Sequence, residues 1–398
     1  MLKRTLQASL RKAARQHPVV TLTGPRQSGK TTLAKNAFPN SEYVSLEDPD
    51  QRSFAQEDPR GFLGRFTGSV ILDEVQRAPD LFSYIQTIVD SEDRPGRFIL
   101  TGSKNFLLMS TISQSLAGRA AILHLLPFSL SELEKRNPFP LAQVGTALPR
   151  GKRTTSRALM DVLFHGFYPR IHDKKLAPQD WLASYYQTYI ERDVRELLTV
   201  GDLEAFGTFI RLCAGRNAQL LNLSSLANDC GISHTTARRW LSVLEMSFLV
   251  TLLRPHHRNF SKRLVKSPKI YFLDTGLLCY LLRIRSPEDL AFHALRGSVF
   301  ESFLVSEFFK NYLHHGQEAD LYFWRDSAGH EIDLIIERGQ ELIPIEAISG
   351  QTVSRDFYSG LRYWTQLSGQ PQASAALVHG GDETYRREGV LTYSWRVL

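Results

Sequence analysis

A glycine-rich loop near the N-terminus has the residue types and the spacing that bind phosphate groups. It follows an apolar run and has the pattern Gly-x-x-x-x-Gly-Lys-Thr of a Walker A motif. In such loops successive backbone N–H groups face one anion, and the next helix adds its positive N-terminal end. Lys30 is expected to reach the β- and γ-phosphates of ATP, and Thr31 to bind Mg²⁺. The predicted ATP-binding residues are Gly24, Pro25, Arg26, Gln27, Ser28, Gly29, Lys30, Thr31, Thr32 and Asp73.

An acidic pair, Asp73 and Glu74, provides the second half of the expected ATP site. The pair follows residues 70–72, a short apolar run of the kind that forms a buried parallel strand. Ligands of open α/β sheets bind beyond the carboxyl ends of the strands, where these two acids would emerge. Asp73 is expected to hold Mg²⁺ through water, and Glu74 to polarise the attacking water as a general base.

Two further side chains are candidates for acting on the γ-phosphate. Ser103 ends the run RFILTGS and could sense the phosphate, with Lys104 or Asn105 as alternates and a plain polar turn as the competing explanation. Arg119 precedes another apolar run and could point at the γ-phosphate of its own site or of a neighbouring copy. An arginine in that role is worth ~10³–10⁵ in rate. A structural salt bridge is the alternative for Arg119.

Five predicted strands form the sheet that positions these residues. They cover residues 19–23, 43–47, 70–73, 98–102 and 121–126, with helices or loops between them. This alternation predicts an α/β fold, namely a P-loop NTPase parallel sheet covered by helices on both faces. The fourth strand is expected to lie between the two strands that carry the Walker residues.

The whole chain is long enough for two or three domains, with 398 residues, 42% of them apolar. No apolar run is long enough to cross a bilayer, and the basic N-terminus lacks the apolar stretch of a secretory signal. The three cysteines are far apart and fit a reducing compartment, so a cytoplasmic location without membrane contact is expected. The predicted domains cover residues 1–135 (ATP binding), 136–200 (linker and helical lid), 201–283 (winged helix) and 284–398 (nuclease-like).

A helix-turn-helix is predicted in the middle of the chain. Its turn is a Cys-Gly-Ile stretch, and Ser233 is expected to cap the second helix. Arg238 and Arg239 would face outward on that helix. Lys262 and Arg263 lie in a basic hairpin that follows like a wing. The arrangement predicts a winged-helix domain with a basic surface.

Positive charge is concentrated in the same region. Between residues 211 and 275 there are ten Lys or Arg and three Asp or Glu, so this segment carries +7, which equals the formal charge of the whole chain. Such clustering is typical of proteins that bind a polyanion, and duplex DNA is the predicted partner. A lid or a protein-binding module is the alternative, because winged helices also serve in those roles.

Three acids in the C-terminal part form a second candidate site. Glu301 lies on a predicted helix, and Asp333 and Glu346 lie on two of the strands that follow. The order helix-strand-strand-strand-helix-strand resembles the restriction-endonuclease-like fold, in which a helix Glu, a strand Asp and a Glu-x-Lys form the nuclease site. The resemblance implies that the acids could hold Mg²⁺, but Ile348 stands in the lysine position. A degenerate nuclease site is therefore predicted.

A basic side chain from another element could still complete this acidic site. Lys310 and Arg325 are candidates, although no spacing requires either of them. If the acids cluster without a metal ion, at least one should have a raised pKa, because like charges oppose ionisation.

Several motifs together resemble one protein family over nearly the whole chain. They are GPRQSGKTTL, VILDEVQRAPDLF, FILTGS, SLAGRA, GFYPR, YIERDVREL, YFLDTGL and GSVFESFLVSEF, in this order. The set resembles the prokaryotic AAA-type ATPases that carry a C-terminal domain of unknown function. That resemblance implies an AAA+-like site for ATP and Mg²⁺.

The function predicted from these features is an ATPase that couples binding and hydrolysis of Mg-ATP to movement of the winged helix and the nuclease-like domain on DNA. One alternative is an ATP-gated, metal-dependent nuclease. The other is a protein-binding switch with negligible turnover. A homo-oligomer is required if Arg119 acts on a neighbouring copy.

Overall fold

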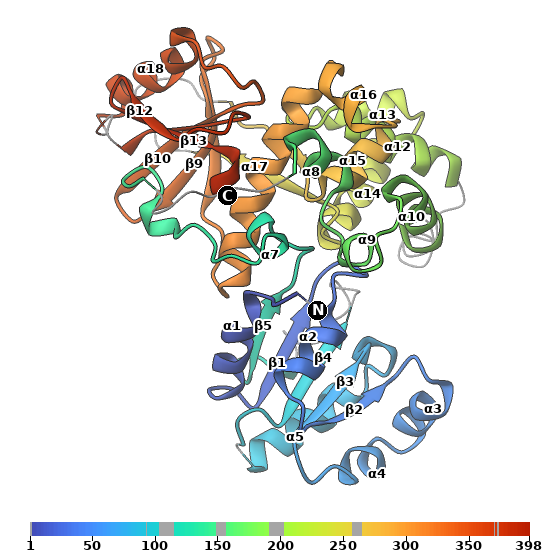
Figure 1. Ribbon diagram of the computed structural model, residues 1–398. Coiled ribbons are helices and arrows are strands. Elements are labelled where there is room, and N and C mark those ends of the chain that lie inside the picture. Colours follow the sequence, from blue (N-terminus) through green and yellow to red (C-terminus); the bar gives the residue numbers. More distant parts are fainter. Residues whose placement is uncertain are drawn as a thin grey trace. The chain divides into compact units, whose positions relative to one another are not determined.

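The computed structural model divides the chain into two compact units, which are described separately (Figure 1). Unit 1 comprises Met1–Phe128, Met246–Phe248 and Tyr312–Glu318, and unit 2 comprises Ser129–Glu245, Leu249–Asn311 and Ala319–Leu398. The structure describes residues 2–92, 94–102, 115–148, 157–190, 203–256, 265–369, 371 and 374–398. The predicted lid, winged helix and nuclease-like parts thus fall mainly within unit 2.

Unit 1 is built on a five-stranded sheet in which all neighbouring strands are parallel (Figure 1). The strands are β1 (Val19–Thr23), β2 (Glu42–Ser45), β3 (Val70–Asp73), β4 (Phe98–Gly102) and β5 (Ala120–His124). Their order is β2-β3-β4-β1-β5, so β4 lies between the two Walker strands. The predicted parallel α/β sheet is confirmed.

Helices cover both faces of this sheet. They are α1 (Leu6–Ala14), α2 (Lys30–Ala37), α3 (Pro49–Glu57), α4 (Pro59–Gly64) and α5 (Leu81–Glu92), with the short η1 (Val75–Arg77) after β3. Side chains alternate along the strands, so Ile71 packs in one core with α1 and α2, whereas Leu72 packs in the other with α4 and α5. Burial on both faces explains why the central strands β1, β3 and β4 are rich in apolar residues.

Most of the later helices belong to unit 2. They are α7 (Leu130–Leu133), η2 (Leu141–Gln143), α8 (Leu159–His165), α9 (Pro169–Lys174), α10 (Pro178–Tyr185), η3 (Tyr186–Ile190), α12 (Leu203–Gly215), α13 (Leu223–Asp229), α14 (His234–Met246), α15 (Thr275–Leu281), α16 (Pro287–Phe292), α17 (Arg296–His314), η4 (Arg355–Tyr358), α18 (Ser359–Ser368) and η6 (Trp395–Val397). Within the described ranges, no helix is both long and apolar enough to cross a membrane.

A buried carboxylate joins the GFYPR and YFLDTGL motifs. The Asp274 side chain accepts hydrogen bonds from the backbone N–H groups of Phe167 and Leu277, each at 2.8 Å. The second bond caps α15. A Cβ at Gly166 would come 2.7 Å from the backbone nitrogen of Gly276, so the two motifs pack backbone against backbone. The two motifs therefore contact each other and stabilise the fold of unit 2.

The predicted helix-turn-helix consists of α13 and α14. The Ser233 hydroxyl accepts a hydrogen bond from the backbone N–H of Thr236 at 3.0 Å, as a helix cap does. The following strands β6 (Val250–Pro255) and β7 (Lys269–Phe272) are antiparallel, and their role as a wing stays a prediction.

A large mixed sheet forms the rest of unit 2, with the strand order β12-β13-β11-β10-β9-β8-β6-β7. Its remaining strands are β8 (Leu321–Arg325), β9 (Glu331–Arg338), β10 (Glu341–Ile348), β11 (Ala376–His379), β12 (Tyr385–Arg387) and β13 (Val390–Ser394). The sequence did not predict β12 and β13. It also did not predict that β6 and β7 join this sheet, through β6 pairing with β8.

Candidate nucleotide-binding site

The loop after β1 is shaped by glycines in backbone conformations that other residues rarely adopt. Gly24 has φ +148°, and a Cβ there would overlap the carbonyl oxygen of Leu125. Gly29 has φ +95° and leads directly into α2. Lys30, the first residue of α2, donates through Nζ to the carbonyl oxygens of Gly24 (3.0 Å) and Pro25 (2.8 Å). The ammonium is therefore held by the loop that is expected to bind phosphate.

Arg4, which the sequence did not single out, supports this loop. Its buried guanidinium donates to the carbonyl oxygen of Ser28 at 2.7 Å and to that of Leu126 at 2.6 Å. It also lies 4.8 Å from the centroid of the Phe128 ring. One cation thus fixes the phosphate loop against residues 126–128.

Asp73, at the end of β3, accepts hydrogen bonds from three hydroxyl groups. Thr31 Oγ1 lies 2.9 Å from Asp73 Oδ2, and the Tyr43 phenol donates to the same oxygen at 2.9 Å. Thr101 Oγ1 donates to Asp73 Oδ1. Burial, together with the Asp73 carboxylate, raises the pKa of Tyr43 to about 12, so the phenol stays protonated and can donate. The two Walker segments therefore meet at Asp73.

Glu74 follows with a left-handed backbone, φ +55° and ψ +43°. A non-glycine residue in this region costs on the order of 1–3 kcal/mol and often marks a functional site. The Gln76 amide donates to the Glu74 carboxylate. The chain therefore turns at Glu74, directly after Asp73.

The residues of this site fit ATP with Mg²⁺. Ser28 Oγ is buried and finds no hydrogen-bond partner within the described residues, so a phosphate oxygen would satisfy it. Lys30 and Ser28 would bind phosphate, while Thr31 and Asp73 provide the oxygen ligands that Mg²⁺ prefers. Of the other predicted residues, Arg26 and Gln27 are half-buried in the loop, and Thr32 is exposed on α2.

Arg119 lies at the amino ends of the strands, whereas the phosphate loop lies at their carboxyl ends. The prediction that Arg119 reaches the γ-phosphate of its own site is therefore wrong. Arg119 directly precedes Ala120, which pairs with Val19 at the start of β1, whereas the phosphate loop follows the end of β1. Its guanidinium Nη2 donates to Asp90 Oδ2 at 3.0 Å. This is the structural salt bridge that was the alternative prediction for Arg119. A role at the nucleotide of a neighbouring copy stays a prediction.

Several predicted residues lie outside the described part of the chain. They are Ser103 with its alternates Lys104 and Asn105, and the wing residues Lys262 and Arg263. Within β4, the polar side chain of Thr101 contacts Asp73. The run RFILTGS contained this signal, because its threonine also lies near the carboxyl end of a buried strand.

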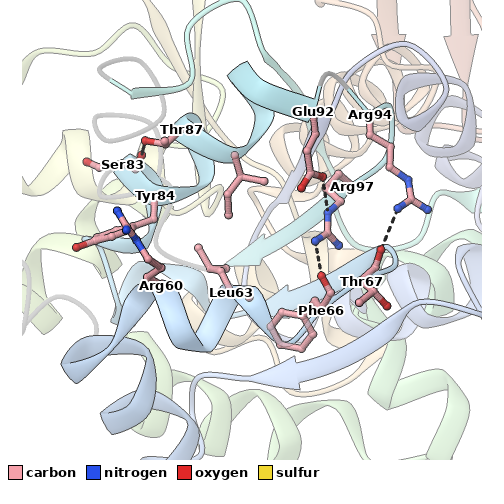
Figure 2. Close-up of a pocket in the computed structure, with 12 residues that line it drawn as sticks. Arg60, Leu63, Phe66, Thr67, Ser83, Tyr84, Thr87, Glu92, Arg94 and Arg97 are labelled. Atoms are coloured by element: carbon pink, nitrogen blue, oxygen red, sulfur yellow. Dashed lines mark hydrogen bonds and ion pairs between the residues drawn. The ribbon is translucent and has the colours of Figure 1, made fainter.

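A second pocket of unit 1, of about 920 Å³, lies between α4 and α5 (Figure 2). It is lined by residues that precede β3 and β4, which places it at the sheet edge opposite the phosphate loop. Two of its arginines are already engaged within the protein: Arg94 donates to the carbonyl oxygen of Thr67 at 3.0 Å, and Arg97 Nε lies 3.3 Å from Glu92 Oε2. The Walker loop, and not this pocket, is the candidate nucleotide site.

Loss of the hydrogen bond from Tyr43 to Asp73 should lower the affinity of the site for Mg²⁺. We expect Tyr43→Phe to raise the Mg²⁺ concentration for half-maximal ATP turnover by roughly tenfold, because groups that orient a metal ligand typically contribute about 10–100-fold to metal affinity. The measurement is turnover against Mg²⁺ at saturating ATP. The control is Tyr84→Phe, a tyrosine of similar exposure on α5 (37% against 36%). Equal Mg²⁺ dependence of Tyr43→Phe and wild type would contradict the role of the phenol.

The predicted acids of the C-terminal part do come together, around a lysine that the sequence analysis missed. Lys269 on β7 lies 3.0 Å from Glu301 Oε1 and 4.0 Å from Asp333 Oδ1. Burial and the neighbouring Asp333 raise the pKa of Glu301 to about 8. The same two causes raise the pKa of Glu346 well above its usual value. The expected pKa rise is therefore present in two of the acids.

The two lysine substitutes suggested by the sequence have different positions. Lys310 is buried elsewhere, with Nζ 2.8 Å from Glu307 Oε1 and over the ring of Phe167. It does not complete the acidic site. Arg325 lies beside this site and pairs with Glu331 at 2.7 Å.

Comparisons with protein families divide the chain in the same order as its motifs. A family described as AAA domain matches residues 16–134. Two domains of unknown function follow, DUF8612 at residues 156–288 and DUF4143 at residues 296–396.

Curated relatives include the uncharacterized proteins Mb2031c of Mycobacterium bovis and Rv2008c of Mycobacterium tuberculosis. Each is 31% identical over 365 residues, which cover 90% of this chain and 77% of the relative. Solved structures include the Walker-type ATPase PABY2304 of Pyrococcus abyssi (14% identity, TM-score 0.44, 70% of this chain and 95% of that chain). The RuvB Holliday junction branch migration motor of Thermotoga maritima is a weaker match (18% identity, TM-score 0.28, 63% and 87%). The chain therefore belongs to the family of these mycobacterial proteins, the AAA-type ATPases with a C-terminal DUF4143 domain.

Proposed function

We propose that the chain binds Mg-ATP between its phosphate loop and Asp73 and hydrolyses it, and that turnover moves the helix-turn-helix on duplex DNA. The observation that carries the nucleotide part is the hydrogen bond of 2.9 Å between the Thr31 hydroxyl and Asp73. It joins the two residues that would share one Mg²⁺. Lys30 binds the β- and γ-phosphates, and Mg²⁺, when bound, neutralises charge on the same phosphates.

Glu74 acts as the general base in this proposal. Its left-handed backbone is a strained conformation directly after Asp73, and strain of this kind clusters at active sites. The carboxylate accepts a hydrogen bond from Gln76, a contact that orients it in the absence of a substrate. From that position Glu74 takes a proton from the attacking water.

The DNA part of the proposal depends on the surface of α14. His234, Thr235, Arg238 and Arg239 are all exposed on this second helix of the helix-turn-helix. Lys269, which contributes to the positive charge of the region, is buried among acids and does not add to that surface. The exposed arginines of α14 would contact phosphates or base edges in the major groove.

Loss of these two arginines should weaken DNA binding in a salt-dependent way. For Arg238→Ala with Arg239→Ala we expect the slope of log K against log salt to become shallower by about 2, since each phosphate contact contributes roughly 0.9. Fluorescence anisotropy of a labelled duplex over a KCl series measures this slope.

The control pair for this experiment is Lys174→Ala with Arg285→Ala, because both side chains are exposed in unit 2 but lie outside the helix-turn-helix. It should leave the slope unchanged. Wild-type protein that binds no duplex, or an unchanged slope in the α14 variant, would contradict the DNA proposal and favour a protein partner. ATP turnover with and without duplex then tests whether the two activities are coupled.

A further inference from the structure

The acidic site of unit 2 is organised around the ammonium group of Lys269. The side chain of Lys269 is 3% exposed, in a strand whose other residues are also buried. Its Nζ lies 3.0 Å from Glu301 Oε1, contacts Glu331 Oε1, and lies 4.0 Å from Asp333 Oδ1. The phenol of Tyr271, two residues further along β7, donates to the same oxygen of Glu301. A single cation therefore faces three carboxylates from α17 and β9.

Two cations lie beside the four carboxyl groups of this site. Its carboxylates belong to Glu301, Glu331, Asp333 and Glu346, and the cations beside them are Lys269 and Arg325. Two negative charges remain. Burial and the neighbouring Asp333 raise the pKa of Glu301 to about 8 and also raise the pKa of Glu346, so both acids take up a proton more readily than an exposed glutamate. Burial opposes the charged form of Lys269, but Glu301, Asp333 and Glu331 raise the pKa of its ammonium group.

The oxygens that a restriction-endonuclease-like fold would offer to a metal ion are already engaged. Asp333 Oδ1 faces Lys269, and Asp333 Oδ2 accepts a hydrogen bond from the backbone N–H of Ala347 at 2.9 Å. Glu346 shares a hydrogen bond with Asp333. Among the residues that the structure describes, no three His, Cys, Asp or Glu side chains are arranged to hold a metal ion. The residues present therefore do not fit the ion that the fold resemblance implies.

We propose that Lys269 is the resident cation of this site: its ammonium group takes the place of a divalent ion and ties the wing strand β7 to α17 and β9. In this proposal the acids bind the lysine and not a metal ion. A buried charge without partners would be strongly destabilising, so the lysine and the acids depend on each other. These contacts fix the position of β7 relative to α17 and β9, whether or not this part of the chain contacts DNA.

Mn²⁺ binding to the full chain without nucleotide tests this proposal. Free Mn²⁺ is counted by electron paramagnetic resonance for wild type, Asp333→Asn and Lys269→Met. Wild type and Asp333→Asn should bind the same amount of Mn²⁺, because the site of the wild-type protein takes none. Lys269→Met should gain one ion, bound at least about tenfold more tightly than any wild-type ion, since removal of a positive charge within about 4 Å favours a cation strongly. Lys269→Met combined with Asp333→Asn should lose it.

Two results would overturn the proposal. One is a wild-type Mn²⁺ ion that Asp333→Asn removes, above all if Mn²⁺-dependent cleavage of duplex DNA is lost in Lys269→Met, because the lysine would then belong to a nuclease site. The other is a folded Lys269→Met that gains no ion. If Lys269→Met does not fold, the comparison of wild type with Asp333→Asn still shows whether Asp333 binds Mn²⁺ in the wild-type protein. The matched control is Lys266→Met, an exposed lysine of the same hairpin, which should bind as wild type does.

Discussion

Glu74→Gln is expected to lower ATP turnover by about 10²–10⁴, because it removes a positioned general base while keeping the size of the side chain. Affinity for Mg-ATP should stay within a few-fold of wild type, since Lys30, Thr31 and Asp73 are unchanged. The backbone should also tolerate the change, because the left-handed conformation of position 74 is fixed by the turn into η1. Phosphate release at saturating Mg-ATP measures turnover, and a fluorescent ATP analogue measures affinity.

The control for Glu74→Gln is Glu42→Gln, the same chemical change at an exposed position at the beginning of β2. Because the strands are parallel, this position lies at the sheet edge opposite the phosphate loop. Its turnover should equal that of wild type. If Glu74→Gln also turns over normally, another group activates the water, and the assignment of Glu74 as the base is wrong.

Lys30→Ala is expected to weaken nucleotide binding by roughly 10–150-fold. The substitution removes an ammonium that would donate to phosphate oxygens, and a hydrogen bond to a charged group contributes about 1.5–3 kcal/mol. The loop itself should keep its shape, because Gly24 and Gly29 set its backbone and Arg4 holds Ser28 from outside. Anisotropy of a fluorescent ATP analogue, titrated with protein in the presence of Mg²⁺, measures the change.

Lys12→Ala is the matched control for this experiment, because Lys12 is an exposed lysine of α1 in the same unit. The control separates loss of the specific contact from a general loss of positive charge. Equal affinity of Lys30→Ala and wild type would mean that the nucleotide binds elsewhere on the protein.

The sequence predicted unit 1 well, because its signals are local. The central strands β1, β3 and β4 are short runs rich in apolar residues, and the Walker motifs follow β1 and end β3. Asp73 is at the end of β3 and Lys30 at the beginning of α2, so the motif spacing alone placed them. The supporting residues Arg4 and Tyr43 could not be found this way, because their contacts with Ser28 and Asp73 depend on how distant segments pack.

Arg119 shows how position within an element decides a role. The motif SLAGRA placed the arginine before a strand, and in a parallel sheet the start of a strand lies at the edge away from the phosphate loop. The same reasoning was applied correctly to Asp73, at the end of its strand. The prediction for Arg119 could have been restricted to a neighbouring copy from the sequence alone.

The contact of Lys269 with the acids was not predicted, because Lys269 falls in the predicted winged-helix domain, which was expected to be separate. The expected lysine position was two residues after Glu346, where Ile348 stands. The structure brings β7 to the same sheet as β9 and β10, so a lysine far away in the sequence reaches Asp333. A charged residue in an otherwise apolar strand was the available signal. The acids that Lys269 contacts could not be identified from the sequence, because they depend on the pairing of β6 with β8, which no local pattern predicts.

Calorimetric titration of the wild-type protein with a slowly hydrolysed ATP analogue and Mg²⁺ tests the central claim most directly. We expect saturable heat with one nucleotide per chain, and a loss of that heat when Asp73 and Thr31 are both replaced by Ala. No heat with the wild-type protein, or unchanged binding by the double variant, would contradict a nucleotide site at the junction of the phosphate loop and β3.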